Sequence, residues 1–196
     1  MPLRNLKNTK YIATLGILTG LIILLANTPI GYIPINAITL TIIHIPVIVG
    51  AIVLGPVAGI VLGAVFGITS FFRAAFGVEP FFAVIYSENP ILLFVICMIP
   101  RIMIGVISAY LYKFLTIIKL KLYISAPVIG IIGSLTNTVL FLAGLFIARR
   151  YFEGIAGTTV IDFLKIVSAV NGLPEAGLAC LLVTAVVMAL KRAKLF

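Results

Sequence analysis

The chain contains 196 residues, of which 63% are hydrophobic and 10% are charged, with a formal net charge of +9. A soluble domain of this size could not cover so much apolar surface, and the composition therefore indicates an α-helical integral membrane protein. The positive charge alone would also fit a nucleic-acid-binding protein. The charges stand at the ends of apolar segments, however, which favours a signal of membrane topology.

Apolar runs of roughly 17 to 21 residues recur along the chain, and a helix needs about 20 residues to cross the hydrocarbon layer of a bilayer. These runs predict one transmembrane domain over residues 1–196, an all-α integral membrane protein with six membrane-spanning helices. In chain order, the helices are predicted at 11–27, 38–54, 56–76, 91–112, 122–148 and 173–190. Gly55 and Pro56 separate the second helix from the third, because glycine often follows a helix and proline often begins one.

Basic residues gather on one side of the predicted membrane. Nine of them precede the first helix, join the fourth to the fifth, or follow the sixth: Arg4, Lys7, Lys10, Lys113, Lys119, Lys121, Lys191, Arg192 and Lys194. All five acidic residues fall on the other side or in the adjoining helix ends. Since cytoplasmic segments carry the excess of Lys and Arg, we expect both termini in the cytoplasm. The same cations are suited to contact anionic lipid headgroups.

Polar residues inside the predicted helices lie mainly in the half opposite the basic ends. Ionisable and hydrogen-bonding groups at membrane depth are costly, and by default they face a cavity or one another. This asymmetry predicts a polar pocket for a small solute, beneath the long connections at 28–37, 77–89 and 149–172. The predicted ligand-binding residues are Asn36, Thr39, His44, Tyr86, Asn89, Arg101, Asn137, Asn171 and Glu175.

Several of these residues also have structural interpretations. Asn36 and Asn171 could cap helices, and Glu175 could do no more than favour a helix N-terminus, where carboxylates are stabilised. Arg101 follows Pro100 in the middle of a predicted helix. It could pair with Glu175 or meet a carboxylate of the ligand, and the sequence leaves both interpretations open.

His44 is the only histidine in the chain and lies in an almost wholly apolar run. Its imidazole carries one donor and one acceptor, and burying them unpaired costs about 1–3 kcal/mol. It could make an interhelical hydrogen bond or contact the ligand, since Pro46 loosens the helix beside it. Asn137 lies too deep in its helix to be a cap, which leaves ligand contact or a bridge between helices.

Two predicted helices carry glycines at four-residue spacing. They are Gly55, Gly59, Gly63 and Gly67 in the third helix, and Gly16 and Gly20 in the first. This spacing places small residues on one helix face, where another helix can approach closely. Either face could pack inside the protein or form an interface with a partner.

The sequence lacks the signatures of catalysis. One histidine cannot supply a paired-histidine metal motif, and we find neither a phosphate-binding Walker motif nor a nucleophile–base arrangement. Cys97 and Cys180 lie in separate apolar runs and are expected to be buried free thiols. We therefore expect a protein that is not an enzyme, with no metal and no cofactor.

Four segments, in this order, resemble a known family: "ITLTIIHIPVIVGAIVLGPVAGIVLGAVFGITSFF", "ENPILLFVICMIPRIMIGVISAYLYK", "GSLTNTVLFL" and "NGLPEAG". Together they are similar to the substrate-binding S component of an energy-coupling factor (ECF) transporter, over about residues 10–192. The resemblance implies a six-helix bundle in a prokaryotic plasma membrane that binds a vitamin from outside.

The resemblance also implies partners. They are a membrane-embedded coupling protein, called the T component, and two cytoplasmic ATPases whose ATP hydrolysis drives the S component to carry the vitamin across. In this family a small-residue face on the first helix, usually of alanines four apart, contacts the coupling protein. Gly16 and Gly20 match that spacing with glycine instead.

The second-helix segment is most similar to pantothenate-type members of the family. Pantothenate has a carboxylate, an amide and two hydroxyl groups, and residue chemistry then suggests that Arg101 pairs with the carboxylate while Asn137 and His44 meet the hydroxyl or amide groups. Hydroxymethylpyrimidine or another small vitamin is the alternative ligand, with riboflavin, folate and thiamin less favoured. Outside this class, a freestanding dimeric membrane transporter is the alternative function.

Overall fold

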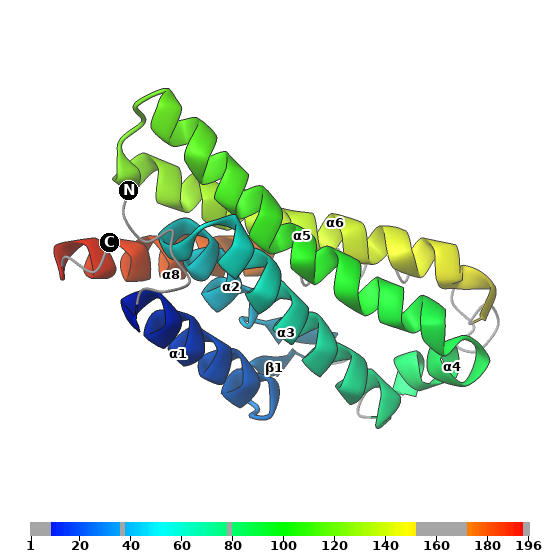
Figure 1. The fold of residues 1–196 in the computed structure, drawn as a ribbon. Helices are drawn as coiled ribbons and strands as arrows, with labels where there is room; N and C mark the ends of the chain where they lie inside the picture. Colours follow the sequence, from blue (N-terminus) through cyan, green and yellow to red (C-terminus); the bar gives the residue numbers. More distant parts are fainter. Residues whose placement is uncertain (1–8, 36–37, 78–79, 152–171, 194–196) are drawn as a thin grey trace.

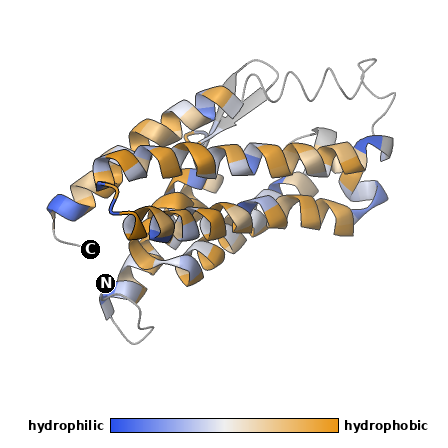
Figure 2. Ribbon diagram, turned by 90° about the horizontal axis from the view of Figure 1, so that it is seen from above, coloured by the Kyte–Doolittle hydropathy of each residue, from blue (hydrophilic) through white to orange (hydrophobic). Residues whose placement is uncertain are grey.

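The computed structural model describes residues 9–35, 38–77, 80–151 and 172–193. Five helices in these ranges are long and apolar enough to cross a membrane: α1 (Thr9–Ala26), α3 (Pro56–Ala75), α5 (Pro90–Ile117), α6 (Leu122–Ala148) and α8 (Leu173–Arg192). They form an elongated bundle (Figure 1). Apolar residues cover most of their length, and hydrophilic residues are more frequent near the ends of the bundle (Figure 2).

Shorter elements complete the described chain. They are the hairpin of β1 (Tyr32–Ile35) and β2 (Ile38–Thr41), the helices α2 (His44–Leu54) and α4 (Pro80–Glu88), and the 3-10 helix η1 (Arg149–Tyr151). Every residue of α2 is buried, so this helix lies at the centre of the bundle and has no lipid-facing side. Its apolar composition reflects burial within the protein.

The prediction of a helix over 38–54 is wrong in its first part. Residues 38–41 form the strand β2, which pairs antiparallel with β1 in the register Tyr32 with Thr41 and Ile35 with Ile38. Isoleucine and threonine favour strands because their branched side chains fit a pleated surface. The helix that follows has only 11 residues, too few to cross a bilayer by itself.

Two further boundaries differ from the sequence prediction. Part of the connection predicted over 77–89 is the helix α4, which begins at Pro80, a residue suited to the first helical position. The helix α5 continues to Ile117, five residues beyond its predicted end at 112. The ends of α1, α3, α6 and α8 lie within two residues of the predicted ends.

The two ends of the bundle differ in chemistry. The start of α1, the α5–α6 connection and the end of α8 lie together at one end, on the left in Figure 1. These segments carry Lys10, Lys113, Lys119, Lys121 and the final pair of cations of α8. The opposite end holds α4, η1 and the end of α6 (Figure 1). Six of the nine basic residues that the sequence assigns to one side therefore lie together at one end, and Arg4, Lys7 and Lys194 fall outside the described residues.

Glycines of α3 allow its backbone to touch that of α5. A Cβ atom on Gly59 would lie 2.7 Å from the carbonyl oxygen of Gly105, and one on Gly63 would overlap the carbonyl of Arg101. A Cβ on Gly67 would lie 2.7 Å from the Sδ of Met98. This face of α3 is filled by the same chain, as the internal-packing interpretation predicts. A partner interface over Gly59, Gly63 and Gly67 is not supported.

The remaining glycines of the two predicted faces behave differently. Gly55 joins α2 to α3 with φ of 94°, a conformation that glycine adopts readily and other residues rarely do. Gly16 and Gly20 are exposed on α1, and a Cβ on either would meet no other atom within 4 Å. Only the α1 pair therefore presents an open small-residue face.

We predict that Gly59→Ala lowers the stability of the purified protein by about 1–3 kcal/mol, because the added methyl group pushes α3 away from α5. Thermal unfolding in detergent measures the effect. Gly16→Ala is the matched control, since its methyl group enters open space. Equal unfolding temperatures for the two variants would contradict the close contact between the helices.

Candidate functional site

Besides several hydroxyl groups, the described structure buries four side chains with charged, amide or imidazole groups, on four different helices. His44 of α2 is 0% exposed, Glu175 of α8 is 2% exposed, Asn137 of α6 is 7% exposed and Arg101 of α5 is 9% exposed. Burying polar groups is unfavourable unless they find hydrogen-bond partners or a ligand. Such residues inside a membrane bundle are therefore the first place to look for a binding site.

Glu175 joins the start of α8 to the hairpin. Its Oε1 accepts hydrogen bonds from the backbone N–H of Thr41 at 2.6 Å and from the Thr41 hydroxyl at 3.0 Å. The carboxylate also stands in the first turn of α8, where the helix dipole favours negative charge. Two segments 134 residues apart in the sequence are thus fastened together beside the start of α2.

Arg101 lies between two aromatic rings. The centre of its guanidinium is 4.8 Å from the ring centroid of Phe141 and 5.3 Å from that of Phe66, distances at which a cation is attracted to a ring face. Its Nη1 donates to the carbonyl of Ile96 at 3.2 Å. That carbonyl is available because Pro100 has no N–H to bond to it.

The electrostatic environment of Arg101 leaves it open to an anion. Its charge acts on Glu175, but the two side chains form no direct ion pair in the described structure. Its Nε is buried and has no hydrogen-bond partner among the described residues. Of the two interpretations of Arg101 given by the sequence, direct pairing with Glu175 is therefore not observed.

His44 and Asn137 also carry unpaired atoms. Both ring nitrogens of His44 and the Oδ1 of Asn137 are buried without a hydrogen-bond partner in the described part of the chain. Ile48, one turn along α2 from His44, packs at Gly133, one turn before Asn137 on α6. The helices α2 and α6 run in opposite directions (Figure 1). The Ile48–Gly133 contact therefore places His44 and Asn137 at a similar depth in the bundle.

The structure places two other predicted residues away from this buried group. The Oδ1 of Asn89 accepts from the backbone N–H of Leu92 at 3.0 Å and so caps α5, while its Nδ2 donates to the Tyr151 hydroxyl at 3.3 Å. Tyr86 is 38% exposed and packs edge-on against Phe71. Both lie at the end of the bundle that carries α4.

Three predicted residues fall outside what the structure describes. Asn36 and Asn171 are not among the described residues, and Thr39 is described only through its backbone in β2. Sequence reasoning in turn missed Phe66 and Phe141, the rings on either side of Arg101. The available signal was spacing: Phe141 follows Asn137 by four residues and therefore shares its helix face.

Aromatic contacts connect this group to α4. The ring of Phe82 on α4 lies 5.7 Å from that of Phe141, which in turn lies beside Arg101. Within the described ranges, no group of three His, Cys, Asp or Glu residues is placed to hold a metal ion. The arrangement offers one cation between two rings, one amide oxygen and one imidazole, which suits a small ligand with a carboxylate and further hydrogen-bonding groups.

Residues 10–187 match the sequence model of the substrate-specific component of ECF transporters. The chain belongs to this family. It is also 34% identical over 163 residues to the pantothenic acid transporter PanT of Lactococcus lactis subsp. cremoris (strain MG1363), an alignment that covers 79% of each protein. The resemblance drawn from the four sequence segments is thereby confirmed, and the match runs from the first turn of α1 into the last turns of α8.

We predict that Glu175→Leu loosens the hairpin, because the backbone N–H of Thr41 loses its acceptor. Amide hydrogen exchange of peptides over residues 38–43 should become faster in this variant. Glu88→Leu is the control, since Glu88 is an exposed carboxylate on α4. Unchanged exchange over 38–43 in Glu175→Leu would show that the Thr41 contact does not hold β2.

Proposed function

We propose that this protein is the high-affinity vitamin-binding subunit of an ATP-driven ECF uptake transporter, and that the vitamin is pantothenate. The observation that carries the ligand assignment is the buried Arg101, held between two rings without a direct acidic partner in the described structure. The name of the relative from Lactococcus lactis supports the same ligand.

The chemistry of pantothenate fits the buried side chains. The molecule has a carboxylate, an amide and two hydroxyl groups. Arg101 pairs with the carboxylate, since a guanidinium presents parallel donors to two carboxylate oxygens. Asn137 accepts from a hydroxyl or the amide through its unpaired Oδ1, and His44 offers one donor and one acceptor. Glu175 acts on the site by holding Thr41 rather than by meeting the carboxylate.

The remaining predicted residues are peripheral to this site in the proposal. Thr39 belongs to β2, Tyr86 and Asn89 lie at the end of the bundle that carries α4, and Asn36 and Asn171 fall outside the described residues. Hydroxymethylpyrimidine or another small neutral vitamin is the second candidate ligand. A cationic vitamin is disfavoured because the buried positive charge of Arg101 would repel it.

The proposed orientation of the protein in the membrane follows from the positions of its charges. We place the basic end of the bundle and both termini in the cytoplasm, because cytoplasmic segments of membrane proteins carry the excess of Lys and Arg. Arg101, Asn137 and Glu175 lie in the half away from that end, so the vitamin enters from outside. ATP hydrolysis takes place in two partner ATPases, which act through a membrane-embedded coupling protein.

The exposed face of α1 is the proposed contact with the coupling protein. Gly16 and Gly20 leave open space on this face, and Ile17 beside them is 71% exposed. Close approach of a partner helix over small residues provides the packing that lipid tails cannot replace. A freestanding dimer would use an open helix face as well, and the composition of the purified complex separates the two functions.

Ligand binding by the purified chain tests the proposed function directly. Among a panel of vitamins, we expect pantothenate to raise the unfolding temperature most, since a ligand that binds only the folded state stabilises it. Arg101→Gln should weaken pantothenate binding roughly 10- to 100-fold, and Asn137→Ala and His44→Phe should weaken it less, because charged hydrogen bonds are the stronger ones.

Ser108→Ala is the control for this series. Ser108 lies on α5 two turns beyond Arg101, is fully buried, and has an unpaired hydroxyl in the described structure, so the variant also removes a buried polar atom. We expect its pantothenate affinity to match that of the natural protein. If a different vitamin gave the largest stabilisation, the assignment of pantothenate as the ligand would be wrong. If Arg101→Gln bound pantothenate with wild-type affinity, Arg101 would not be part of the site.

We predict that Gly16→Leu lowers the yield of the coupling protein and ATPases that co-purify with this chain, while leaving pantothenate binding unchanged. The leucine side chain fills the open face of α1 and keeps the partner helix at a distance. Gly177→Leu on α8 is the matched control, because Gly177 is also exposed with no atom within 4 Å of its Cβ position. Equal yields for both variants would place the coupling contact elsewhere.

A further inference from the structure

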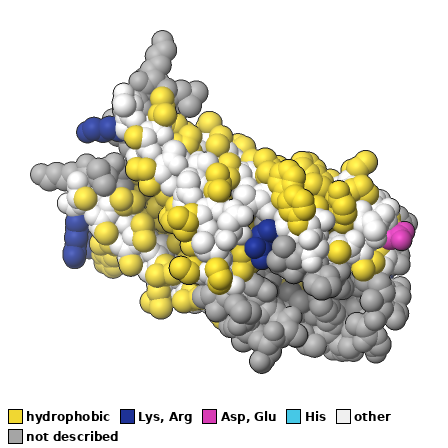
Figure 3. All heavy atoms as spheres, turned by 90° about the horizontal axis from the view of Figure 1, so that it is seen from below, with side chains coloured by type: hydrophobic (Ala, Val, Ile, Leu, Met, Phe, Trp, Pro, Cys, Tyr) yellow, Lys and Arg dark blue, Asp and Glu magenta, His cyan; other side chains and the backbone are white. Residues whose placement is uncertain are grey.

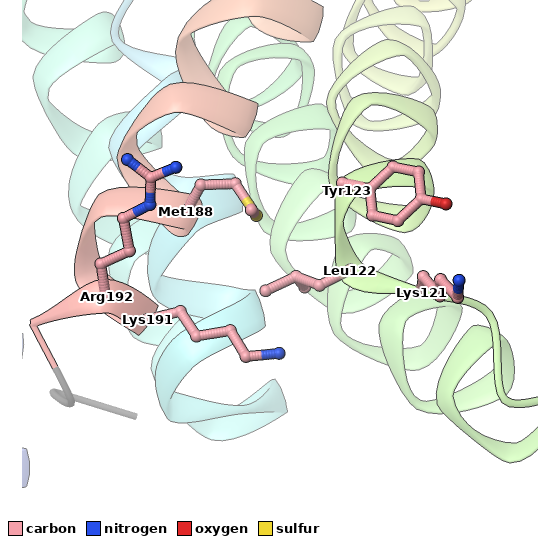
Figure 4. A pocket seen from close by; sticks show the side chains of 6 residues that line it. All are labelled: Lys121, Leu122, Tyr123, Met188, Lys191 and Arg192. Carbon is pink, nitrogen blue, oxygen red and sulfur yellow. The ribbon is translucent and has the colours of Figure 1, made fainter.

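A cavity of about 470 Å³ lies between the start of α6 and the end of α8, at the basic end of the bundle. It is lined by Lys121, Leu122, Tyr123, Met188, Lys191 and Arg192. Figure 4 shows that Leu122 and Met188 point into the gap from the two helices, with Lys191 and Arg192 on the α8 side and Lys121 and Tyr123 on the α6 side. The apolar floor thus has three cations along its rim, of which Lys191 extends toward the gap in this view.

The charges of this cavity are not balanced within the described chain. The described part of the chain has two acidic residues. Glu88 lies on α4 at the opposite end of the bundle, and Glu175 accepts hydrogen bonds from Thr41. Lys121 lies over the Tyr123 ring, with its Nζ 5.9 Å from the centroid, and is exposed. The cavity thus has an uncompensated positive charge facing outward from the protein.

The start of α6 adds backbone N–H groups, which carry partial positive charge. Lys121 is the residue before α6, and no side chain caps the first turn of this helix. The N–H of Ile124 already donates to the carbonyl of Lys121 at 2.9 Å, so the donors left in this first turn are the N–H groups of Leu122 and Tyr123. Such groups attract anions together with the helix dipole. Lys and Arg side chains beside such a helix start form a suitable site for a phosphate group.

The surface that continues from the cavity is apolar. On α8, Leu181 lies two turns before Met188 on the same face and is 69% exposed. On α6, Ile124 and Ile131 stand seven residues apart on one face and are 39% and 36% exposed. On the face of the molecule that is seen from below, hydrophobic side chains also gather near Lys and Arg side chains (Figure 3). A ligand with a charged head and long apolar chains would match both parts.

We propose that this cavity binds an anionic phospholipid, with the phosphate at the basic rim that Lys121, Lys191 and Arg192 form and the acyl chains along the outer faces of α6 and α8. A free phosphate would satisfy only the cations and would leave the apolar floor and the exposed leucine and isoleucine side chains unused. Basic pockets between membrane helices at the bilayer surface recognise lipid headgroups in this way. The site is separate from the proposed vitamin site and carries no role in binding the vitamin.

Native mass spectrometry of the full chain tests the proposal. The purified protein is stripped of lipid and exposed to vesicles of phosphatidylglycerol and phosphatidylcholine in equal amounts. We expect wild type to retain phosphatidylglycerol selectively. Lys121→Gln combined with Lys191→Gln should weaken this retention about 25-fold, at about fivefold for each removed charge. Pantothenate binding should stay unchanged, which shows that the variant is folded.

Lys113→Gln combined with Lys119→Gln is the matched control. It removes the same charge from exposed positions at the same end of the bundle, outside the cavity. Equal loss of phosphatidylglycerol in both double variants would assign the effect to a diffuse basic surface and overturn the site. If inorganic phosphate stabilised the protein as much as phosphatidylglycerol does, the ligand of the cavity would be a free anion and not a lipid. Loss of the coupling protein with unchanged lipid retention would assign the cations to a protein partner.

Discussion

The contact between Gly63 and the backbone of Arg101 determines where the central cation stands. A side chain at Gly63 would overlap the Arg101 carbonyl, so the two helices can approach this closely only with glycine there. The same closeness brings Phe66, one turn further along α3, beside the guanidinium. The close packing of α3 against α5 therefore also fixes the position of the Arg101 charge that is proposed to bind the ligand. A larger residue on this face would alter both the packing and the position of Arg101.

Buried polar groups in this bundle are only partly satisfied by the protein itself. Pro100 removes one backbone donor and thereby leaves an acceptor for Arg101, and the Oε1 of Glu175 accepts from two donors of Thr41. The ring nitrogens of His44 and the Oδ1 of Asn137 have no partner in the described structure. An unpaired buried group costs about 1–3 kcal/mol, and a polar ligand that pairs with it recovers this free energy. Affinity and the instability of the free protein would then have a common origin.

Local patterns in the sequence predicted the long helices well, because membrane-spanning segments differ from everything else by length and hydropathy. The glycine spacing in α3 likewise predicted a close helix contact, although it could not tell whether the neighbour was α5 or another protein. The strand Ile38–Thr41 was missed since it runs directly into the apolar helix α2, and nothing in hydropathy separates a buried strand from a buried helix.

The sequence predicted the polar side chains of the proposed vitamin site but not the phenylalanines beside them. Arg101, Asn137 and Glu175 stood out because charged and amide groups are rare inside membrane helices. Phe66 and Phe141 did not, because a phenylalanine facing lipid and one facing a guanidinium have the same sequence signal. Asn89 resembled a ligand contact but caps α5, which shows that a helix N-terminus can account for an isolated asparagine.

The two proposed anion sites use opposite electrostatic conditions. Arg101 is 9% exposed and lies between rings, so a carboxylate beside it would interact in a poorly screened environment, where one charge and good geometry are sufficient. Lys121, Lys191 and Arg192 are exposed, where salt screens each charge, and several cations are needed to hold one phosphate. Rising ionic strength should therefore release the lipid from α6 and α8 at concentrations that leave vitamin binding nearly unchanged.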